Sequence, residues 1–127
     1  MYQKTLYIWL MNSTELLKGT LTTIILKLLA DHEKMYGYEI AQKVKELSED
    51  KILLKEGSLY PALHKLLKEG LVEVETKHVG KRVRKYYSIT RQGQAKKQLQ
   101  FDELQEFLKT IQHIIFPQPN QLSPDVK

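Results

Sequence analysis

The sequence predicts a mainly α-helical protein of the α+β class, in which three helices, a two-stranded hairpin and one long helix follow each other. Apolar residues recur at helical spacing up to Gly70, alternate with polar ones as far as Thr90, and return to helical spacing up to about Phe116. A change of apolar period from 3.6 to 2 marks the change from helices to strands. The length of 127 residues fits one domain with a hydrophobic core of its own.

The first helix is expected from about Thr14 to Ala30, directly after an N-terminal extension of residues 1–13. Ser13 and Thr14 are residue types that cap helix N-termini. The apolar positions of this helix share one face, as a half-buried helix requires. They are Leu17, Leu21, Ile24, Ile25 and Leu28. The apolar run at residues 6–11 is too short for a membrane span and lacks a cleavage site, so we expect neither an anchor nor a signal peptide.

A second helix is expected from Tyr36 to Leu47, because Ile40 and Val44 repeat at helical spacing with these two residues. Gly37 at its start is consistent with a tight entry of the chain into the helix. Tyr36 and the nearby Tyr38 are interpreted as packing residues.

The third helix is expected in the stretch KEGSLYPALHKLLKEG, residues 55–70. Ser58 would cap its start, and Gly70 suits the left-handed residue at its end. Pro61 would lie in the first turn, where the backbone N–H groups have no intrahelical acceptor. The leucines and Ala62 gather on one side of this helix. The other side contains no carboxylate and presents Pro61, His64, Lys65 and Lys68, with Tyr60 at the border.

The segments LVEVETKHV and RVRKYYSIT are rich in β-branched and aromatic residues and meet at Gly80-Lys81, which predicts a hairpin. Successive residues of a strand point to opposite faces. Tyr86 and Tyr87 therefore face opposite sides, and one of them is expected in the core.

A last helix is expected from a Thr90 cap to about Phe116, where Pro117 and Pro119 end it. Its apolar residues are spaced 3, 4, 3 and 4, like the seam of a coiled coil. They are Phe101, Leu104, Leu108, Ile111 and Ile115. Such a stripe would also suit a helix that packs on its own domain, but three helices already supply that core, which favours a partner helix. The polar, proline-rich residues 117–127 are expected to be disordered.

Three helices closed by a two-stranded hairpin form a winged helix-turn-helix, in which the second and third helices make the turn motif and the hairpin is the wing. The predicted organisation is an N-terminal extension, a winged helix-turn-helix domain, a C-terminal dimerisation helix and a tail. Their ranges are 1–13, 14–90, 91–116 and 117–127.

The net charge of +5 is concentrated around the hairpin. Between Thr76 and Phe101 there is no Asp or Glu, while eight cations occur, which are Lys77, Lys81, Arg82, Arg84, Lys85, Arg91, Lys96 and Lys97. A run of this kind is often only solvated surface, but its position on a wing favours contact with phosphates. Strand alternation predicts a phosphate-facing row of Arg82 and Arg84, with Lys85 on the opposite face.

The blocks GSLYPALHKLLKEGLVE and GKRVRKYYSITRQG, together with YGYEIAQKV, resemble the signature of the PadR family of bacterial winged-helix transcriptional regulators over about residues 16–93. The resemblance implies a homodimeric repressor whose third helix enters the major groove of DNA and whose wing contacts the backbone and the adjacent minor groove. The implied contacts are Ser58, Tyr60, Pro61, His64 and Lys65 on the helix, and Lys81, Arg82, Arg84 and Lys85 on the wing. Lys65 and Lys68, as point charges, suit phosphates better than bases.

The single C-terminal helix resembles that of the short subgroup of this family, some members of which respond to aromatic drugs through an aromatic residue of that helix, often Trp. The only tryptophan here is Trp9, although Phe101 and Phe107 could line an apolar gap. A small-molecule effector therefore stays an open expectation. Two-fold symmetry of the dimer implies a pseudo-palindromic operator in double-stranded DNA.

Enzymatic, cofactor and metal chemistry find little support in the sequence. The four histidines are scattered without an HExxH motif or a cysteine partner, and neither a glycine-rich phosphate loop nor a GxSxG elbow occurs. The lack of cysteine weakly favours the cytoplasm. Two other classes stay open: a winged helix that serves only protein interaction, which needs no acid-free basic hairpin, and a small ligand-binding enzyme, which needs a convergent polar pocket.

Overall fold

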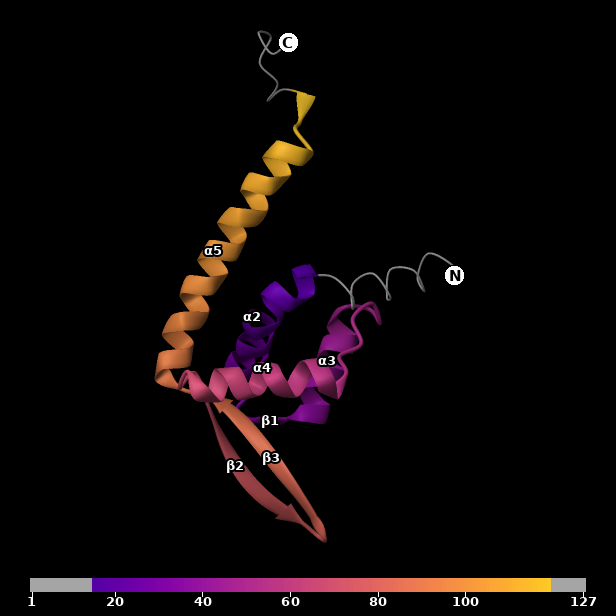
Figure 1. The fold of residues 1–127 in the computed structure, drawn as a ribbon, viewed down its shortest axis with the longest axis vertical. Helices are drawn as coiled ribbons and strands as arrows, with labels where there is room; N and C mark the ends of the chain where they lie inside the picture. The colour runs from indigo at the N-terminus through magenta and orange to yellow at the C-terminus, as the bar shows by residue number, and fades with distance from the viewer. Residues whose placement is uncertain (1–14, 120–127) are drawn as a thin grey trace. The chain divides into compact units, whose positions relative to one another are not determined.

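The computed structural model describes residues 15–119, which contain four helices and a three-stranded sheet (Figure 1). In chain order these are α2 (Glu15–Asp31), β1 (Met35–Tyr36), α3 (Gly37–Leu47), α4 (Glu56–Lys68), β2 (Val72–Val79), β3 (Arg82–Ile89) and α5 (Arg91–Ile115). The chain divides into two compact units, one ending at Lys97 and one beginning at Gln98. The cap candidates Ser13 and Thr14, Trp9 and most of the predicted tail lie outside the described residues.

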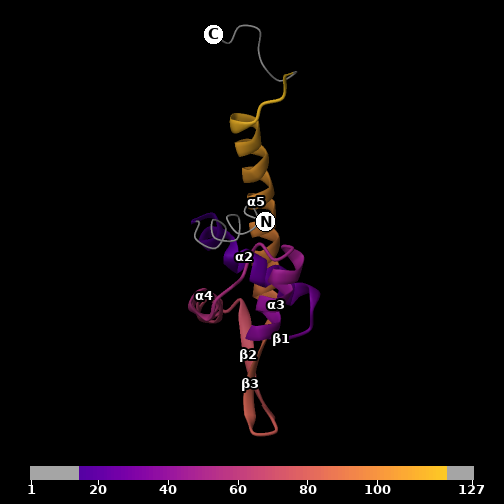
Figure 2. The same cartoon turned by 90° about the vertical axis from the view of Figure 1, so that its right-hand side faces the viewer.

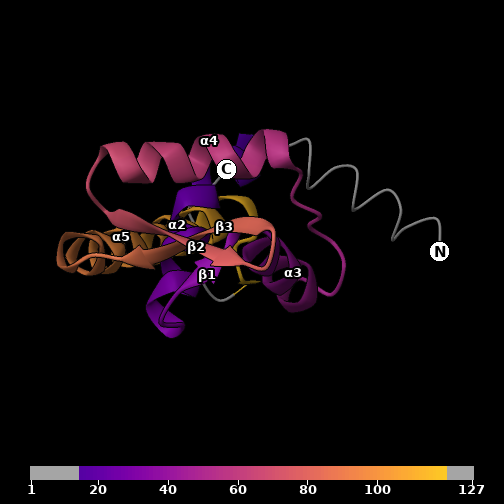
Figure 3. The same cartoon turned by 90° about the horizontal axis from the view of Figure 1, so that it is seen from below.

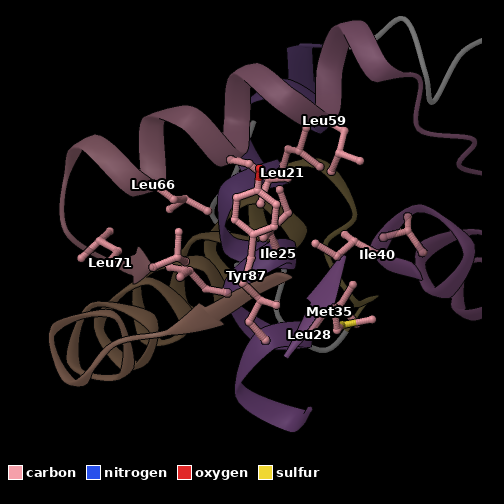
Figure 4. Packing of buried hydrophobic residues seen from close by; sticks show 14 residues of the cluster. Leu21, Ile25, Leu28, Met35, Ile40, Leu59, Leu66, Leu71 and Tyr87 are labelled. Carbon is pink, nitrogen blue, oxygen red and sulfur yellow. The ribbon is translucent and has the colours of Figure 1, made fainter. Parts of the chain in front are cut away.

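The first unit is a winged helix-turn-helix, as the sequence predicts. One hydrophobic core joins α2, α3, α4 and the sheet (Figure 4). Its fully buried side chains are Ile25, Leu26, Leu29, Ile40, Leu63 and Leu66. Leu47 was expected in this core and is instead 68% exposed, because α3 ends at this residue.

The sheet has the strand order β1-β3-β2 and is antiparallel throughout. The two-residue strand β1 was not predicted; it pairs Met35 with Tyr87 and Tyr36 with Tyr86. Tyr87 is buried and Tyr86 is half-buried, which confirms that they face opposite sides. The β2–β3 turn contains Gly80 at a φ of +63°, a conformation that glycine adopts at little cost.

Helix α4 begins at Glu56 after Lys55, whose side chain makes no capping hydrogen bond. The prediction that Ser58 caps this helix and that Pro61 lies in its first turn is therefore wrong. Pro61 is the sixth helical residue, so the Gly57 carbonyl lacks its intrahelical donor, and water can replace that donor because both residues are exposed.

The end of α4 follows the prediction. Gly70 has a φ of +74°, its N–H donates to the Leu67 carbonyl over 3.0 Å, and the Leu71 N–H donates to the Leu66 carbonyl over 3.0 Å. This pair of bonds is the Schellman motif, which favours glycine at the left-handed position. The stop fixes where the chain leaves α4 and enters β2.

The start of α5 is also fixed locally, by Thr90. Its hydroxyl accepts from the Gly93 N–H over 3.0 Å and donates to the Gly70 carbonyl over 2.8 Å. Gly93 lies so close to the Leu71 carbonyl that an added Cβ would overlap it. Thr90 is therefore the predicted cap, and it ties the first turn of α5 to the end of α4.

Candidate nucleic-acid interface

The exposed side of α4 gathers the residues that the sequence assigns to the recognition element. It lies opposite Leu59, Leu63 and Leu66, which are buried. Its members, all exposed, are Ser58, Tyr60, Pro61, His64, Lys65 and Lys68. No carboxylate occurs within residues 57–68, so this side offers hydroxyl, imidazole and ammonium groups with no negative charge among them.

Tyr60 connects the two helices of the turn motif. Its ring lies against Gly37 at the start of α3, where a Cβ would be 2.5 Å from the Tyr60 hydroxyl oxygen and 2.9 Å from the ring carbon that carries it. The side chain is nevertheless 43% exposed. Tyr60 can therefore hold α4 against α3 and still present its edge to a partner, whereas any larger residue at position 37 would displace it.

The hairpin has two chemically different faces, which follow from its register. We call the face that contains buried Tyr87 the inner face, because Tyr87 points from β3 toward α4 (Figure 4). Beyond the core this face carries Thr76, His78, Val83 and Lys85, which are cross-strand partners in pairs. It contains no acidic residue. Figures 2 and 3 show the hairpin between α4 on one side and α3 with β1 on the other.

The outer face of the hairpin consists of the alternate residues, which are Glu73, Glu75, Lys77, Val79, Arg82, Arg84, Tyr86 and Ser88. Both acidic residues of β2 are on this face. Arg82 and Arg84 share it, as predicted, and Lys85 is on the inner face. Lys81 lies in the turn, and Lys81, Arg82 and Lys85 are exposed, whereas Arg84 is half-buried.

Two of the outer cations are engaged with aromatic rings. The Arg84 guanidinium carbon is 4.5 Å from the centre of the Tyr36 ring. Lys77 Nζ is 5.5 Å from the centre of the Tyr86 ring, which meets Tyr36 edge to face at 5.5 Å. A hydrogen bond to Tyr86 and the nearby Tyr36 hydroxyl raise the pKa of Arg84. Lys34 adds an ion pair of 3.3 Å with Glu75.

The tyrosines that begin α3 were predicted as packing residues, and the structure divides them. Tyr36 is half-buried among the outer-face contacts, with its N–H donating to Glu39 Oε1 over 3.1 Å. Tyr38 stacks on Tyr36 with ring centres 6.3 Å apart and is mostly exposed, so it is no core residue. The sequence reasoning missed Tyr36 as a partner of the wing, because no local pattern relates residues 48 positions apart.

The predicted seam of α5 remains open to solvent in the described chain. Leu108 and Ile115 are 57% and 58% exposed, while Phe101, Leu104 and Ile111 are half-buried. Phe107 and Ile114 are 55% and 69% exposed. With Leu104 and Ile111 they form a second apolar row along α5, because residues three or four positions apart are neighbours on a helix surface. These residues form an apolar stripe along α5 that is partly exposed.

The described residues offer little for other chemistries. Within residues 15–119, no group of three or more His, Asp or Glu side chains is placed to hold a metal ion. A shallow hollow of about 390 Å³ beside α3 is lined by Tyr36, Tyr38 and Lys43, among others. The ammonium group of Lys43 forms an ion pair with Glu46 over 3.2 Å. No helix of this range has both the length and the hydrophobicity needed to cross a bilayer.

Comparison with known proteins identifies the family. Residues 25–99, more than half of the chain, match the family described as transcriptional regulator PadR-like. The chain belongs to this family. An uncharacterised protein of Lysinibacillus sphaericus is 34% identical to this PadR-like regulator over 85 residues, which are 65% of this chain and 75% of that protein.

Solved structures agree with this assignment. A transcriptional regulator from Clostridium thermocellum superposes with a TM-score of 0.76 at 28% identity, covering 80% of this chain and 99% of its own. PadR-family regulators from Eggerthella lenta and Bacillus cereus both give a TM-score of 0.70, at 27% and 28% identity. They cover 82% and 83% of this chain, and 88% and 100% of their own. The winged-helix fold is therefore that of other PadR-family regulators.

Proposed function

We propose that this PadR-like regulator binds duplex DNA as a homodimer and represses transcription in the cytoplasm. The observation that carries the proposal is a surface without carboxylates, made of the exposed residues of α4 that follow Glu56 and of the inner face of the hairpin. DNA presents one negative charge per about 1.7 Å of helix axis, so a surface that carries cations and no carboxylates is attracted to its backbone. This surface has these properties over α4 and over the hairpin that follows it in the chain.

The two parts of this surface have different tasks. His64 and Tyr60, which combine donors with apolar area, suit base edges, whereas Lys65 and Lys68 suit phosphates. Ser58 and Pro61 lie toward the start of α4, the end that recognition helices direct at the bases. On the wing, Lys85 lies on the inner face, and Lys81 and Arg82 lie at the tip, where they would follow the backbone into the neighbouring groove.

The open stripe of α5 supports a dimer. Two copies of an apolar stripe can bury each other around a two-fold axis, which is the commonest symmetry of homo-oligomers. Its seam residues would be Phe101, Leu104, Leu108, Ile111 and Ile115. A two-fold dimer would present two α4 helices about 34 Å apart, one turn of DNA, and hence select a pseudo-palindromic operator.

A small-molecule effector that releases the DNA, as in drug-responsive relatives of the short subgroup, belongs to the same proposal. The phenylalanines of α5 are Phe101 and Phe107, and Phe116 directly follows the helix. Displacement of labelled operator by aromatic compounds is the suitable assay.

Selection of bound duplexes from a random pool tests the proposal with the full chain. We expect enrichment of a pseudo-palindromic site whose affinity falls steeply with salt concentration. A variant with Lys65 and Lys68 changed to Glu serves as the matched negative control. If the unmodified protein enriches no duplex and shows no salt-dependent binding, the alternative of a protein-interaction module replaces this one.

A further inference from the structure

The base of the wing contains a contact that joins it to the turn motif. Arg84 extends from β3 to the ring of Tyr36, with 4.5 Å between the guanidinium carbon and the ring centre. Tyr36 is the last residue of β1 and directly precedes α3. Together with the edge-to-face contact between Tyr86 and Tyr36, this contact links the hairpin to the residue that directly precedes α3.

The register shows why a contact is needed at this position. Strand β1 pairs only with Tyr86 and Tyr87, so β3 loses its neighbour on that side one residue before Tyr86. From there to the turn, the wing is a two-stranded ribbon, which is marginally stable alone and twists more than a wider sheet. Arg84 is the first outer-face residue beyond the end of β1. It is also the cation of the wing that is half-buried, while Lys81, Arg82 and Lys85 are exposed.

The chemistry of this contact favours arginine. A guanidinium is planar, stacks on an aromatic face and remains weakly hydrated, whereas an ammonium is a compact and strongly hydrated charge. Tyr86 adds a hydrogen bond to the same guanidinium. Lys77 on the ring of Tyr86 and Lys34 paired with Glu75 reinforce the same side of the sheet.

We propose that Arg84 is a positioning residue of the wing: by stacking on Tyr36 it holds the hairpin at a fixed angle to α3 and α4, and it makes no phosphate contact. This assignment departs from the sequence prediction, which placed Arg84 with Arg82 in one phosphate-facing row. Its consequence for DNA affinity rests on the proposed function. Its consequence for the order of the wing does not.

The first test uses the DNA-free protein, by hydrogen exchange of the backbone amides in residues 76–85. Arg84→Ala and Arg84→Lys should each raise the exchange rate about two- to five-fold, because each removes one cation–π contact at the protein surface. Arg82→Ala, which removes a neighbouring arginine from the same face, is the matched control and should leave exchange unchanged. Unchanged exchange in both Arg84 variants would overturn the proposal.

The partner residue provides a second arm of this test. Tyr36→Phe keeps the ring and should keep the exchange of the original protein. Tyr36→Leu should raise exchange at least as much as Arg84→Ala, because it also removes the ring contact with Tyr86. Adding Arg84→Ala to Tyr36→Leu should raise exchange no further, because both changes remove the same contact. Full additivity of the two substitutions would contradict the assignment.

DNA titrations at several salt concentrations then separate positioning from phosphate contact. Arg84→Ala and Arg84→Lys should both lower affinity about two- to five-fold without changing the slope against salt, whereas Arg82→Ala should reduce that slope by about 0.9 per lost contact. Rescue by Arg84→Lys together with a reduced slope in Arg84→Ala would show that Arg84 binds phosphate. If the original protein binds no DNA, the proposed function fails, and the exchange experiment still decides the role of Arg84.

Discussion

The two faces of one hairpin differ in the side chains that surround their cations. Both carry cations, but the outer face also carries Glu73 and Glu75, and its Lys77 and Arg84 lie on aromatic rings. The inner face has no acid, and its Lys85 is exposed toward the side of α4. The net charge of +5 therefore says little about which cations a partner can reach. Strand register decides that, because it assigns each cation to a face.

The largest expected effect comes from reversing charges on the two faces in matched pairs. Changing Lys68 and Lys85 to Glu on the side of α4 should weaken operator binding by at least about 100-fold at 0.1 M salt, since favourable phosphate contacts become repulsive. Changing Lys34 and Lys77 to Glu alters the net charge equally and should cost less than about 10-fold, because screening weakens distant charges. Fluorescence anisotropy of labelled DNA measures both, and circular dichroism checks the fold.

If both pairs of substitutions weaken operator affinity equally, the two faces do not differ in DNA binding, and only the total charge of the protein matters. A larger loss for the outer pair would reverse the comparison and place the DNA against Glu73 and Glu75.

The next effect concerns α5, which supplies the second copy of the surface. Ile111→Asp places a charge in the predicted dimer contact and should weaken the free energy of dimerisation by several kcal/mol. Sedimentation at micromolar concentration should then show a monomer in place of a dimer. Operator affinity should fall with it, because each monomer reaches one half-site. Gln112→Asp adds the same charge at the next, exposed position and should remain dimeric. A monomer before any substitution would contradict the proposed assembly.

A smaller effect is expected where Tyr60 meets Gly37. Gly37→Ala puts a methyl group 2.5 Å from the Tyr60 hydroxyl oxygen, so the ring must move from its place between α3 and α4. Because the atoms that must shift are the end of a partly exposed side chain, we expect a loss of less than about 1 kcal/mol in the free energy of unfolding, measured by urea denaturation. Gly57→Ala, where a Cβ has open space, is the control and should be neutral or stabilising. Equal stability of the two variants would remove this contact from the account.

The smallest effect is a pH dependence at the base of the inner face. Burial raises the pKa of the Tyr87 hydroxyl. The folded protein therefore holds this proton more tightly than the unfolded chain, whose tyrosine titrates near pH 10. The contribution of this proton to the free energy of unfolding is fully present below about pH 10. It is lost as the pH rises through the pKa of Tyr87 in the folded protein. Tyr87→Phe should reduce the loss of thermal stability that occurs above about pH 10. If the variant loses as much stability as the original protein over this pH range, Tyr87 is not its source.

Much of the fold could be predicted because its signals are local. The cap that Thr90 forms with the Gly93 N–H is local, and so are the bonds to the Leu66 and Leu67 carbonyls that end α4 at Gly70. The apolar periods of α2, α3 and α4 likewise do not depend on distant partners. The N-cap of α4 was predicted three residues late. Ser58 is a good cap by residue type, but the chain turns into the helix at Lys55 without any side-chain cap.

The remaining features depend on contacts between distant residues. Strand β1 has two residues and exists only because β3, 50 positions later, pairs with it. The stack of Arg84 on Tyr36 and the fit of Tyr60 on Gly37 have no sequence pattern for the same reason. Alternation correctly separated Arg82 and Arg84 from Lys85, but it could not tell which of Tyr86 and Tyr87 is buried. Which face of the hairpin is directed toward α4 could therefore not be predicted from the sequence.

The most direct test of the central claim compares single lysines on the two faces of the hairpin. Operator affinity is measured for Lys85→Ala and Lys77→Ala across a range of salt concentrations. The account predicts that Lys85→Ala reduces the slope of log affinity against log salt by about 0.9 per lost contact, while Lys77→Ala leaves it unchanged. A reduced slope for Lys77→Ala with an unchanged slope for Lys85→Ala would contradict it.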